Sequence, residues 1–337
     1  MQIGSGETTY QWNDNWAKAP ATESASAGWA HHGVAITEAD DIVSYHQQDS
    51  TLLLFDRDGN LKRSWPSGLT EGHGITLVKE GDTEYLWIAD SGRKRHPRHG
   101  YAYPDGDGTP VNGRVVKMSL DGRTVMSLQR PDLPVYTQGD YMPTWVTVNE
   151  ERNGGNGDIW VADGYGASYV HRYDKGGVYI ASINGEEGAA GAFKCPHAVF
   201  IDIRRPEAEL YVADRTNGRI QVYDTLGNFK RVFGSEFLTS PSGFATHNDI
   251  MVVAELRARL AILDINDNLV TYLGANLEVC EIEGWPNVRN ERGELARPHH
   301  LEPGKFNSPH GMAVDAEGNI YVAEWLIGGR FTKLARV

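Results

Sequence analysis

The sequence has little cysteine, no long apolar run and no extended block of positive charge. Its 337 residues include two cysteines, Cys195 and Cys280, too few for a disulfide framework. No stretch approaches the roughly 18 consecutive apolar residues of a membrane span, and Met1–Trp16 lacks the apolar core of a secretory signal. The net charge of −13 argues against nucleic acid or an anionic membrane as partner. We therefore expect a cytoplasmic protein that acts on a small molecule, of undetermined oligomeric state.

Positive charge is concentrated in one short segment, Arg93–His99, which contains three arginines and a lysine in seven residues. The simpler interpretation is a solvated loop. The alternative is a recognition patch for an acidic group.

What the sequence does contain is an internal repeat. Each copy begins with a short segment containing Pro or Gly, continues through alternating apolar residues to Ala-Asp or Ala-Glu, and then adds further short strands. The clearest copy is Cys195–Gly234. Six copies begin near residues 32, 73, 144, 197, 242 and 310. Their β-branched and aromatic runs, separated by Gly, Asn and Asp, are typical of β-strands and turns.

The repeat predicts an all-β fold, a six-bladed β-propeller formed as a single domain over residues 1–337. A small antiparallel sheet cannot bury both faces alone, and radial stacking also protects the strand edges. The last copy has room for only three strands, so the N-terminal segment Thr8–Asn13 is expected to add the fourth and close the ring. Inserted loops near 91–113 and 275–307 are expected to form lids or rims.

Aligning the copies places a set of histidines at equivalent positions. The residues that open the innermost strands are His32, His73, Thr144, His197, Ser242 and His310. Blades two, four and six thus contribute His73, His197 and His310, and three converging imidazoles suit Zn²⁺ with an open position, although other divalent transition metals are also accepted. The alternative is turn chemistry, with each imidazole bonded to a backbone carbonyl. His31 is expected to point elsewhere.

A second set of residues follows the Ala-Asp motif of each copy, at the end of the second strand. His46 and Gln47 align there with Asp214 and Arg215, and the third and sixth copies contribute Tyr165 and Trp325. The acidic residues are expected to cap turns. Arg215 can bind an anionic group and Tyr165 can transfer a proton, whereas His32, His46, Gln47 and Trp325 are candidates for substrate contact.

These motifs resemble the NHL-repeat propellers and, among them, the peptidyl-α-hydroxyglycine α-amidating lyases. The resemblance is strongest at Val161–Tyr165, at Cys195–Ala198 with Val212–Gln221, and at Ser308–Gly311. It implies a catalytic zinc on His73, His197 and His310, a catalytic tyrosine at Tyr165 and an active-site arginine at Arg215. The sequence departs from the family at Gln47, where a second arginine is expected, and at Gly311, where an acidic residue is associated with structural calcium. A calcium site is therefore not expected.

The leading functional hypothesis is a zinc-dependent lyase that cleaves the C–N bond of a carbinolamide to an amide and an aldehyde. A metal-dependent hydrolase of a lactone or ester is an alternative, distinguished by entry of ¹⁸O from water into the product. A non-catalytic NHL binding module is the third possibility, since fold alone does not fix function. Cys195 is expected to be a buried thiol.

Overall fold

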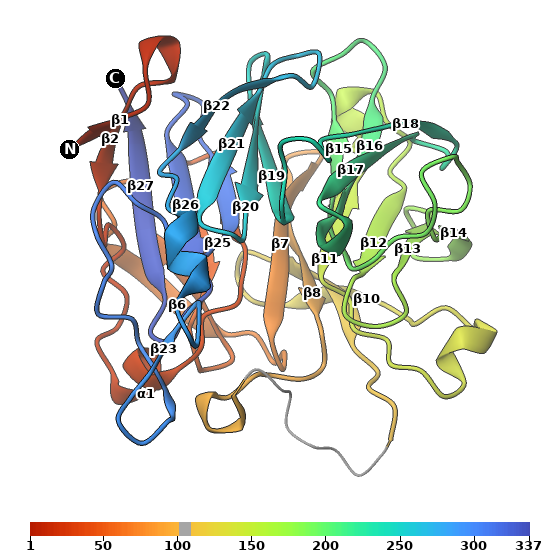
Figure 1. Cartoon of the computed structure of the whole chain (residues 1–337). Helices are drawn as coiled ribbons and strands as arrows, with labels where there is room; N and C mark the ends of the chain where they lie inside the picture. The colour runs from red at the N-terminus through yellow and green to blue at the C-terminus, as the bar shows by residue number, and fades with distance from the viewer. Residues whose placement is uncertain (101–108) are drawn as a thin grey trace. The chain divides into compact units, whose positions relative to one another are not determined.

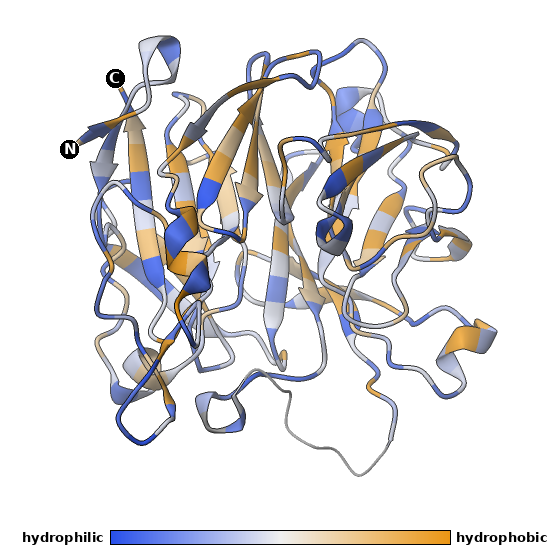
Figure 2. Ribbon diagram, in the orientation of Figure 1, coloured by the Kyte–Doolittle hydropathy of each residue, from blue (hydrophilic) through white to orange (hydrophobic). Residues whose placement is uncertain are grey.

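The predicted six-bladed β-propeller fold is confirmed by the computed structural model, which describes residues 1–100 and 109–337 (Figure 1). Each of the six repeats forms its own antiparallel sheet, and within each sheet the repeat's strands pair in chain order. Aspartate, asparagine and glycine residues form the turns between strands, as in the Asp224–Asn228 turn, where the Asp224 carboxylate accepts the backbone N–H groups of Leu226 and Asn228. Figure 2 shows apolar residues gathered in the strands and polar residues in the connecting loops.

The chain divides into two compact units. The first consists of the described parts of Met1–Gly68, Lys94–Pro104 and Phe244–Val337, and the second of those of Leu69–Arg93 and Asp105–Gly243. Each unit is described by itself below. The expectation of a single domain remains a prediction.

The second unit contains the sheets of repeats two, three and four. Their strands, grouped by repeat, are β7 (Gly72–Glu80), β8 (Thr83–Asp90), β9 (Arg114–Ser119) and β10 (Thr124–Leu128); β11 (Trp145–Val148), β12 (Ile159–Asp163), β13 (Tyr169–Tyr173) and β14 (Tyr179–Ile183); and β15 (Pro196–Asp202), β16 (Glu209–Asp214), β17 (Arg219–Asp224) and β18 (Phe229–Phe233). The 3₁₀ helices are η3 (Pro134–Tyr136), η4 (Glu151–Asn153) and η5 (Arg215–Asn217). Buried side chains of repeats two and three, including Trp87, Val146 and Val161, form one apolar cluster.

The first unit contains the sheets of repeats one and six and nearly all of repeat five, whose first strand begins just before the unit boundary. The strands are β3 (Val34–Ile36), β4 (Ile42–Tyr45), β5 (Thr51–Phe55) and β6 (Leu61–Pro66); β19 (Pro241–His247), β20 (Ile250–Glu255), β21 (Arg259–Leu263) and β22 (Leu269–Leu273); and β25 (Pro309–Val314), β26 (Ile320–Glu324) and β27 (Arg330–Arg336), extended by β2 (Tyr10–Asn13) and β1 (Gln2–Ile3). The short helices are α1 (Glu23–Ala27), η1 (Gly6–Thr8), η2 (Pro97–His99) and η6 (Leu277–Glu281).

The N-terminal segment completes the last sheet, as expected. Strand β2 pairs antiparallel with β27, with Tyr10 opposite Arg336 and Trp12 opposite Leu334. Both β2 aromatics are buried, and the Trp12 ring lies 4.7 Å from that of Phe306. Joining the two ends of the chain in one sheet satisfies a strand edge that would otherwise be open.

Both predicted insertions contain ordered structure. The insertion at 275–307 forms η6 and a small hairpin of β23 (Val288–Arg289) and β24 (Leu295–Ala296). The insertion at 91–113 includes η2, which contacts β24 within the first unit, whereas residues 101–108 lie outside the described residues. Whether either insertion acts as a lid stays a prediction. No helix in the described chain is long and apolar enough to span a bilayer.

Candidate active site

Three of the histidines that open innermost strands share an unusual backbone position. The strand pairing shifts register between Gly72 and Ile75, between Pro196 and Ala198, and between Pro309 and Gly311. His73, His197 and His310 fall in these three gaps. A bulge of this kind turns its extra residue out of the ladder and is a common device for aiming a side chain near an active site.

Each of these imidazoles is then oriented by the neighbouring repeat. The Nδ1 atom of His73 lies 2.6 Å from the carbonyl oxygen of Thr144, and that of His197 lies 2.7 Å from the carbonyl oxygen of Ser242. In the first unit, Nδ1 of His310 lies 3.2 Å from the carbonyl oxygen of His32. Because a carbonyl can only accept, Nδ1 must carry the proton, and the neutral ring keeps its lone pair on Nε2.

The glycine of the His-Gly pair explains how the neighbouring strand comes so close. A Cβ atom on Gly74 would lie 2.6 Å from the Thr144 carbonyl oxygen, and one on Gly311 would lie 2.5 Å from the His32 carbonyl oxygen. These carbonyls are the ones that accept from His73 and His310. Gly311 therefore has no room for an acidic side chain. In repeat four the corresponding residue is Ala198, so glycine is not required there.

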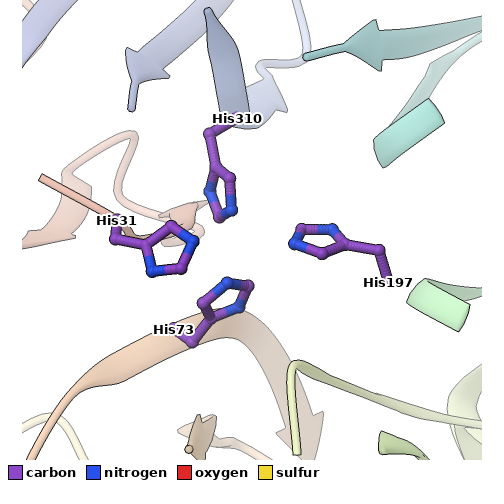
Figure 3. A group of neighbouring side chains, drawn as sticks. All are labelled: His31, His73, His197 and His310. Carbon is purple, nitrogen blue, oxygen red and sulfur yellow. The ribbon is translucent and has the colours of Figure 1, made fainter. Parts of the chain in front are cut away.

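In the second unit, the two histidines flank the hydroxyl group of Tyr165. The Tyr165 oxygen lies 3.2 Å from Nε2 of His73 and 3.0 Å from Nε2 of His197. The rings of His73 and His197, which are both fully buried, have centroids 4.9 Å apart (Figure 3). Arg215 donates from Nη1 to the same Tyr165 oxygen at 3.3 Å, and its guanidinium lies over the Tyr165 ring. Residues from the second and fourth repeats thus converge on the phenolic oxygen of the third.

In the first unit, His310 lies beside His31 rather than His32. The ring centroids of His31 and His310 are 4.7 Å apart, and Figure 3 shows the two imidazoles next to each other. Both side chains are buried. The indole ring of Trp325 lies 5.5 Å from the His31 ring and stacks on that of Trp29 at 5.5 Å. The surroundings of this histidine pair are therefore largely aromatic.

The sequence did not indicate His31, and the reason is local. Strand β3 starts only at Val34, and the preceding residues have no strand pairing apart from an isolated bridge at Trp29. Side-chain alternation therefore does not apply to residues 31 and 32, and the expectation that His31 points away from the other histidines is wrong. The one feature of the sequence that could have indicated His31 is that it is adjacent to His32, which aligns with the other histidines.

His32 occupies a buried structural environment. Its Nδ1 lies 3.1 Å from the Ser44 hydroxyl, and its ring stacks on Phe331. Burial lowers the pKa of His32 to about 3, and the nearby charge of Lys94 lowers it as well. The ring is therefore neutral at physiological pH. Its Nε2 atom has no hydrogen-bond partner among the described residues.

His46 and Gln47 contact the backbone around them. Nδ1 of His46 accepts the N–H groups of Gln48 and Asp49, at 3.1 and 2.9 Å. Burial lowers the pKa of His46. Gln47 donates from Nε2 to the carbonyl of Gly328. Both remain predictions as substrate contacts.

The acidic residues that end the second strands cap turns, as expected. Asp90 accepts the backbone N–H groups of Thr70 and Glu71, and Glu324 accepts those of Asn307 and Ser308. Each carboxylate thereby ties the end of its second strand to the segment entering the first. Cys195 is half-buried, so the expectation of a buried thiol is not met; it has a positive φ of 59°, and its carbonyl accepts the Arg215 N–H.

The fold and these histidines define a β-propeller with a candidate metal-binding active site, and comparison with known proteins supports this class. The chain is 25% identical over 297 residues to peptidyl-alpha-hydroxyglycine alpha-amidating lyase 1 of Drosophila melanogaster, covering 82% of this chain and 47% of the relative. It is 26% identical over 319 residues to the human NHL repeat-containing protein 3, covering 88% and 80%. No family model matches the chain.

Among solved structures, a streptogramin B lyase has the same fold. Its TM-score is 0.58 at 12% identity, with 98% of this chain and 99% of that chain covered. The chain thus has distant homologues among amidating lyases and NHL-repeat proteins, which confirms the resemblance that its motifs indicated. It spans less than half the length of the Drosophila relative.

Proposed function

We propose that the protein is a metal-dependent lyase that cleaves the C–N bond of a carbinolamide, with zinc as the expected ion. The observation that carries the proposal is the shared orientation of three buried histidines. His73, His197 and His310 each direct Nδ1 to a backbone carbonyl, which leaves Nε2 as the ligand atom. A metal-binding histidine is usually held in this way through its second nitrogen.

The residues fit a divalent metal by their chemistry. Neutral imidazoles are preferred ligands of Zn²⁺ and of several other transition metals, and all of these rings are buried. We assign His73, His197 and His310 as ligands, with His31 as an additional candidate because it lies beside His310. A bound ion would act as a Lewis acid toward the substrate hydroxyl oxygen and favour its loss of a proton.

Tyr165, in its ionised form, is placed to accept that proton. Its oxygen lies within 3.2 Å of the Nε2 atoms of His73 and His197, so it is adjacent to the proposed ligand atoms. The guanidinium of Arg215 contacts the same oxygen and can stabilise negative charge on it. When the C–N bond breaks, its electrons pass to the nitrogen, which takes up a proton to form the amide, while the carbinol carbon becomes the aldehyde. Tyr165 can return the proton it received.

Two relatives support lyase chemistry at the level of their names, an amidating lyase and a streptogramin B lyase. The name of the first suggests a peptidyl-α-hydroxyglycine substrate. We propose a smaller hydroxylated amide for this chain, because Gln47 stands where the resemblance predicts a second arginine.

The first test is metal content. Protein purified without chelator should contain about one transition metal ion per chain by plasma mass spectrometry. Single replacements of His73, His197 or His310 by Ala should lose it while circular dichroism retains the β-sheet signal. A wild-type protein that contains no stoichiometric metal and takes none up on titration would remove the metal from the proposal.

The second test is the reaction. Metal-loaded protein is incubated with N-benzoyl-α-hydroxyglycine in H₂¹⁸O. A lyase should release benzamide without ¹⁸O, together with glyoxylate, whereas a hydrolase should produce labelled benzoate. Bound metal without C–N cleavage of this or other hydroxylated amides would contradict the lyase assignment.

A further inference from the structure

The basic segment Arg93–His99 meets the candidate site in the first unit. The guanidinium carbon of Arg95 lies 5.4 Å from the centroid of the Trp325 ring. Trp325 is in turn 5.5 Å from the ring of His31, which lies beside the proposed ligand His310. Trp325 therefore lies between the positive charge of Arg95 and the histidine pair.

A guanidinium that lies over an indole ring at this distance is attracted to it as a cation to a π system. Its N–H groups lie in the plane of the guanidinium, where they can donate to an acceptor. An arginine held in this way suits a carboxylate, because the two parallel N–H groups match two carboxylate oxygens. Trp325 is itself fixed by its stacking on the fully buried Trp29.

The charge of the segment supports the same ligand class. Residues 93–99 contain no acidic residue, in a chain with a net charge of −13.

The repeat itself supplies no cation to this part of the first unit. At the position after the second strand, the second unit carries Ser91, Gly164 and Arg215, and Arg215 contacts Tyr165. The corresponding positions of the first unit hold Gln47, Leu256 and Trp325, none of which is charged. Arg95 brings a positive charge to Trp325 from outside the repeat.

We propose that Arg95, which lies over Trp325, binds the carboxylate of an anionic substrate and so distinguishes α-hydroxy-amides that carry a carboxylate group from those that do not. The inference rests on the proposed function for the identity of the site, and it adds the residue that recognises the carboxylate.

The kinetic test compares two substrates that differ only in charge, N-benzoyl-α-hydroxyglycine and its carboxamide. Arg95→Ala should raise KM for the carboxylate about tenfold or more, leave kcat within about threefold, and leave the carboxamide nearly unchanged. Arg95→Lys keeps the charge without the planar fork and should recover only part of the loss. Arg93→Ala is the matched control, since it removes the same charge from the same segment, and both substrates should stay within about twofold.

A binding measurement separates this inference from the proposed reaction. Hippurate and its carboxamide have no carbinol group to cleave, and their affinities are measured by calorimetry on the metal-loaded protein. Hippurate should bind wild type at least about tenfold more tightly than Arg95→Ala, even if the lyase assay fails. Equal hippurate affinity in wild type and Arg95→Ala, or an equal loss in Arg93→Ala, would overturn the assignment and leave the segment a solvated loop.

Discussion

The two units carry similar histidine pairs in different surroundings. In the second unit, the hydroxyl of Tyr165 lies between His73 and His197 and also accepts a hydrogen bond from Arg215. In the first unit, His310 and His31 lie against Trp325, which is stacked on Trp29. One pair has a group that can exchange a proton, and the other has buried aromatic neighbours.

This difference suggests a division of labour. Proton transfer needs a hydroxyl or acid within hydrogen-bond distance, which the second unit provides, whereas binding of an apolar or anionic substrate needs aromatic surface and a fixed cation. Substitutions in the second unit should therefore reduce kcat. Those around Trp325 should act on KM.

The largest expected effect is that of Tyr165→Phe. Loss of the hydroxyl should lower kcat on a hydroxylated amide by about 10²- to 10⁴-fold, the usual contribution of a positioned proton-transfer group. Metal content should not change, because the three imidazoles remain. Tyr169→Phe is the control, since Tyr169 stacks on His171 instead, and it should keep kcat within about twofold. Unchanged turnover in Tyr165→Phe would exclude Tyr165 from the reaction.

The next effect concerns acid stability and a position in the third strand of each repeat, which holds a titratable group in repeat three but not in the repeats of the first unit. His171, in the middle of β13, is buried, and burial lowers its pKa to about 3. The corresponding residues of the first unit, Leu53, Ala261 and Thr332, do not titrate. Below pH 6.5 the unfolded chain binds a proton that folded His171 does not, so the stability falls as the pH falls. The loss at pH 5 is about 2 kcal/mol.

The neighbouring Asp163 acts in the opposite direction. Burial raises its pKa to about 6, so between pH 6 and 4 the folded protein takes up this proton first and gains stability. His171→Gln isolates the histidine contribution: urea unfolding at pH 7 and pH 5 should show a smaller acid loss in the variant than in wild type. An identical loss in both would mean that His171 is protonated without cost.

Comparison of His31 with His32 tests the histidine pair of the first unit. His31→Ala should weaken metal binding about tenfold or more, a typical effect of losing a group that contacts the ligands. His32→Ala should leave metal affinity unchanged, because that ring packs on Phe331 and faces Ser44. Competition with a chromogenic chelator measures both. Equal metal affinities of the two variants would remove His31 from the site.

The smallest effect is expected at Gly74. An added Cβ would lie 2.6 Å from the Thr144 carbonyl oxygen and 2.8 Å from Trp145, so Gly74→Ala must push the neighbouring strand away from His73. Urea unfolding should show a destabilisation of about 1 kcal/mol or more. Gly176→Ala, whose nearest neighbour would be the flexible Asp174 side chain at 3.2 Å, is the control and should change stability by less than about 0.5 kcal/mol. Equal stability of the Gly74 and Gly176 variants would show that the strand moves without cost.

The fold could be predicted from the sequence because each repeat contains the strand and turn pattern that defines its sheet. The alternation of apolar residues and the regular Ala-Asp ends place every sheet, and the shortage of residues after the last repeat predicts the β2–β27 pairing. Strand periodicity acts over neighbouring residues, so it can be read from a single chain.

Site residues that lie outside the repeated strands were harder to predict from the sequence. His73, His197 and His310 occupy equivalent positions of the aligned repeats, so the sequence predicted them as one set of ligands. The structure adds that all three lie at bulges. His31 lies before β3, where alternation gives no direction for the side chain. The contact of Arg95 with Trp325 joins an insertion to a distant repeat, and no local pattern encodes such a contact.

The bulges have a consequence for how such a protein can change over time. A residue outside the ladder contributes no paired position, so the sheet keeps its hydrogen bonds whatever side chain stands there. A blade can therefore gain or lose a histidine without losing the hydrogen bonds of its own ladder, and the residues of the site are separable from the architecture that carries them. The same scaffold can thus be shared by enzymes and by proteins without chemistry.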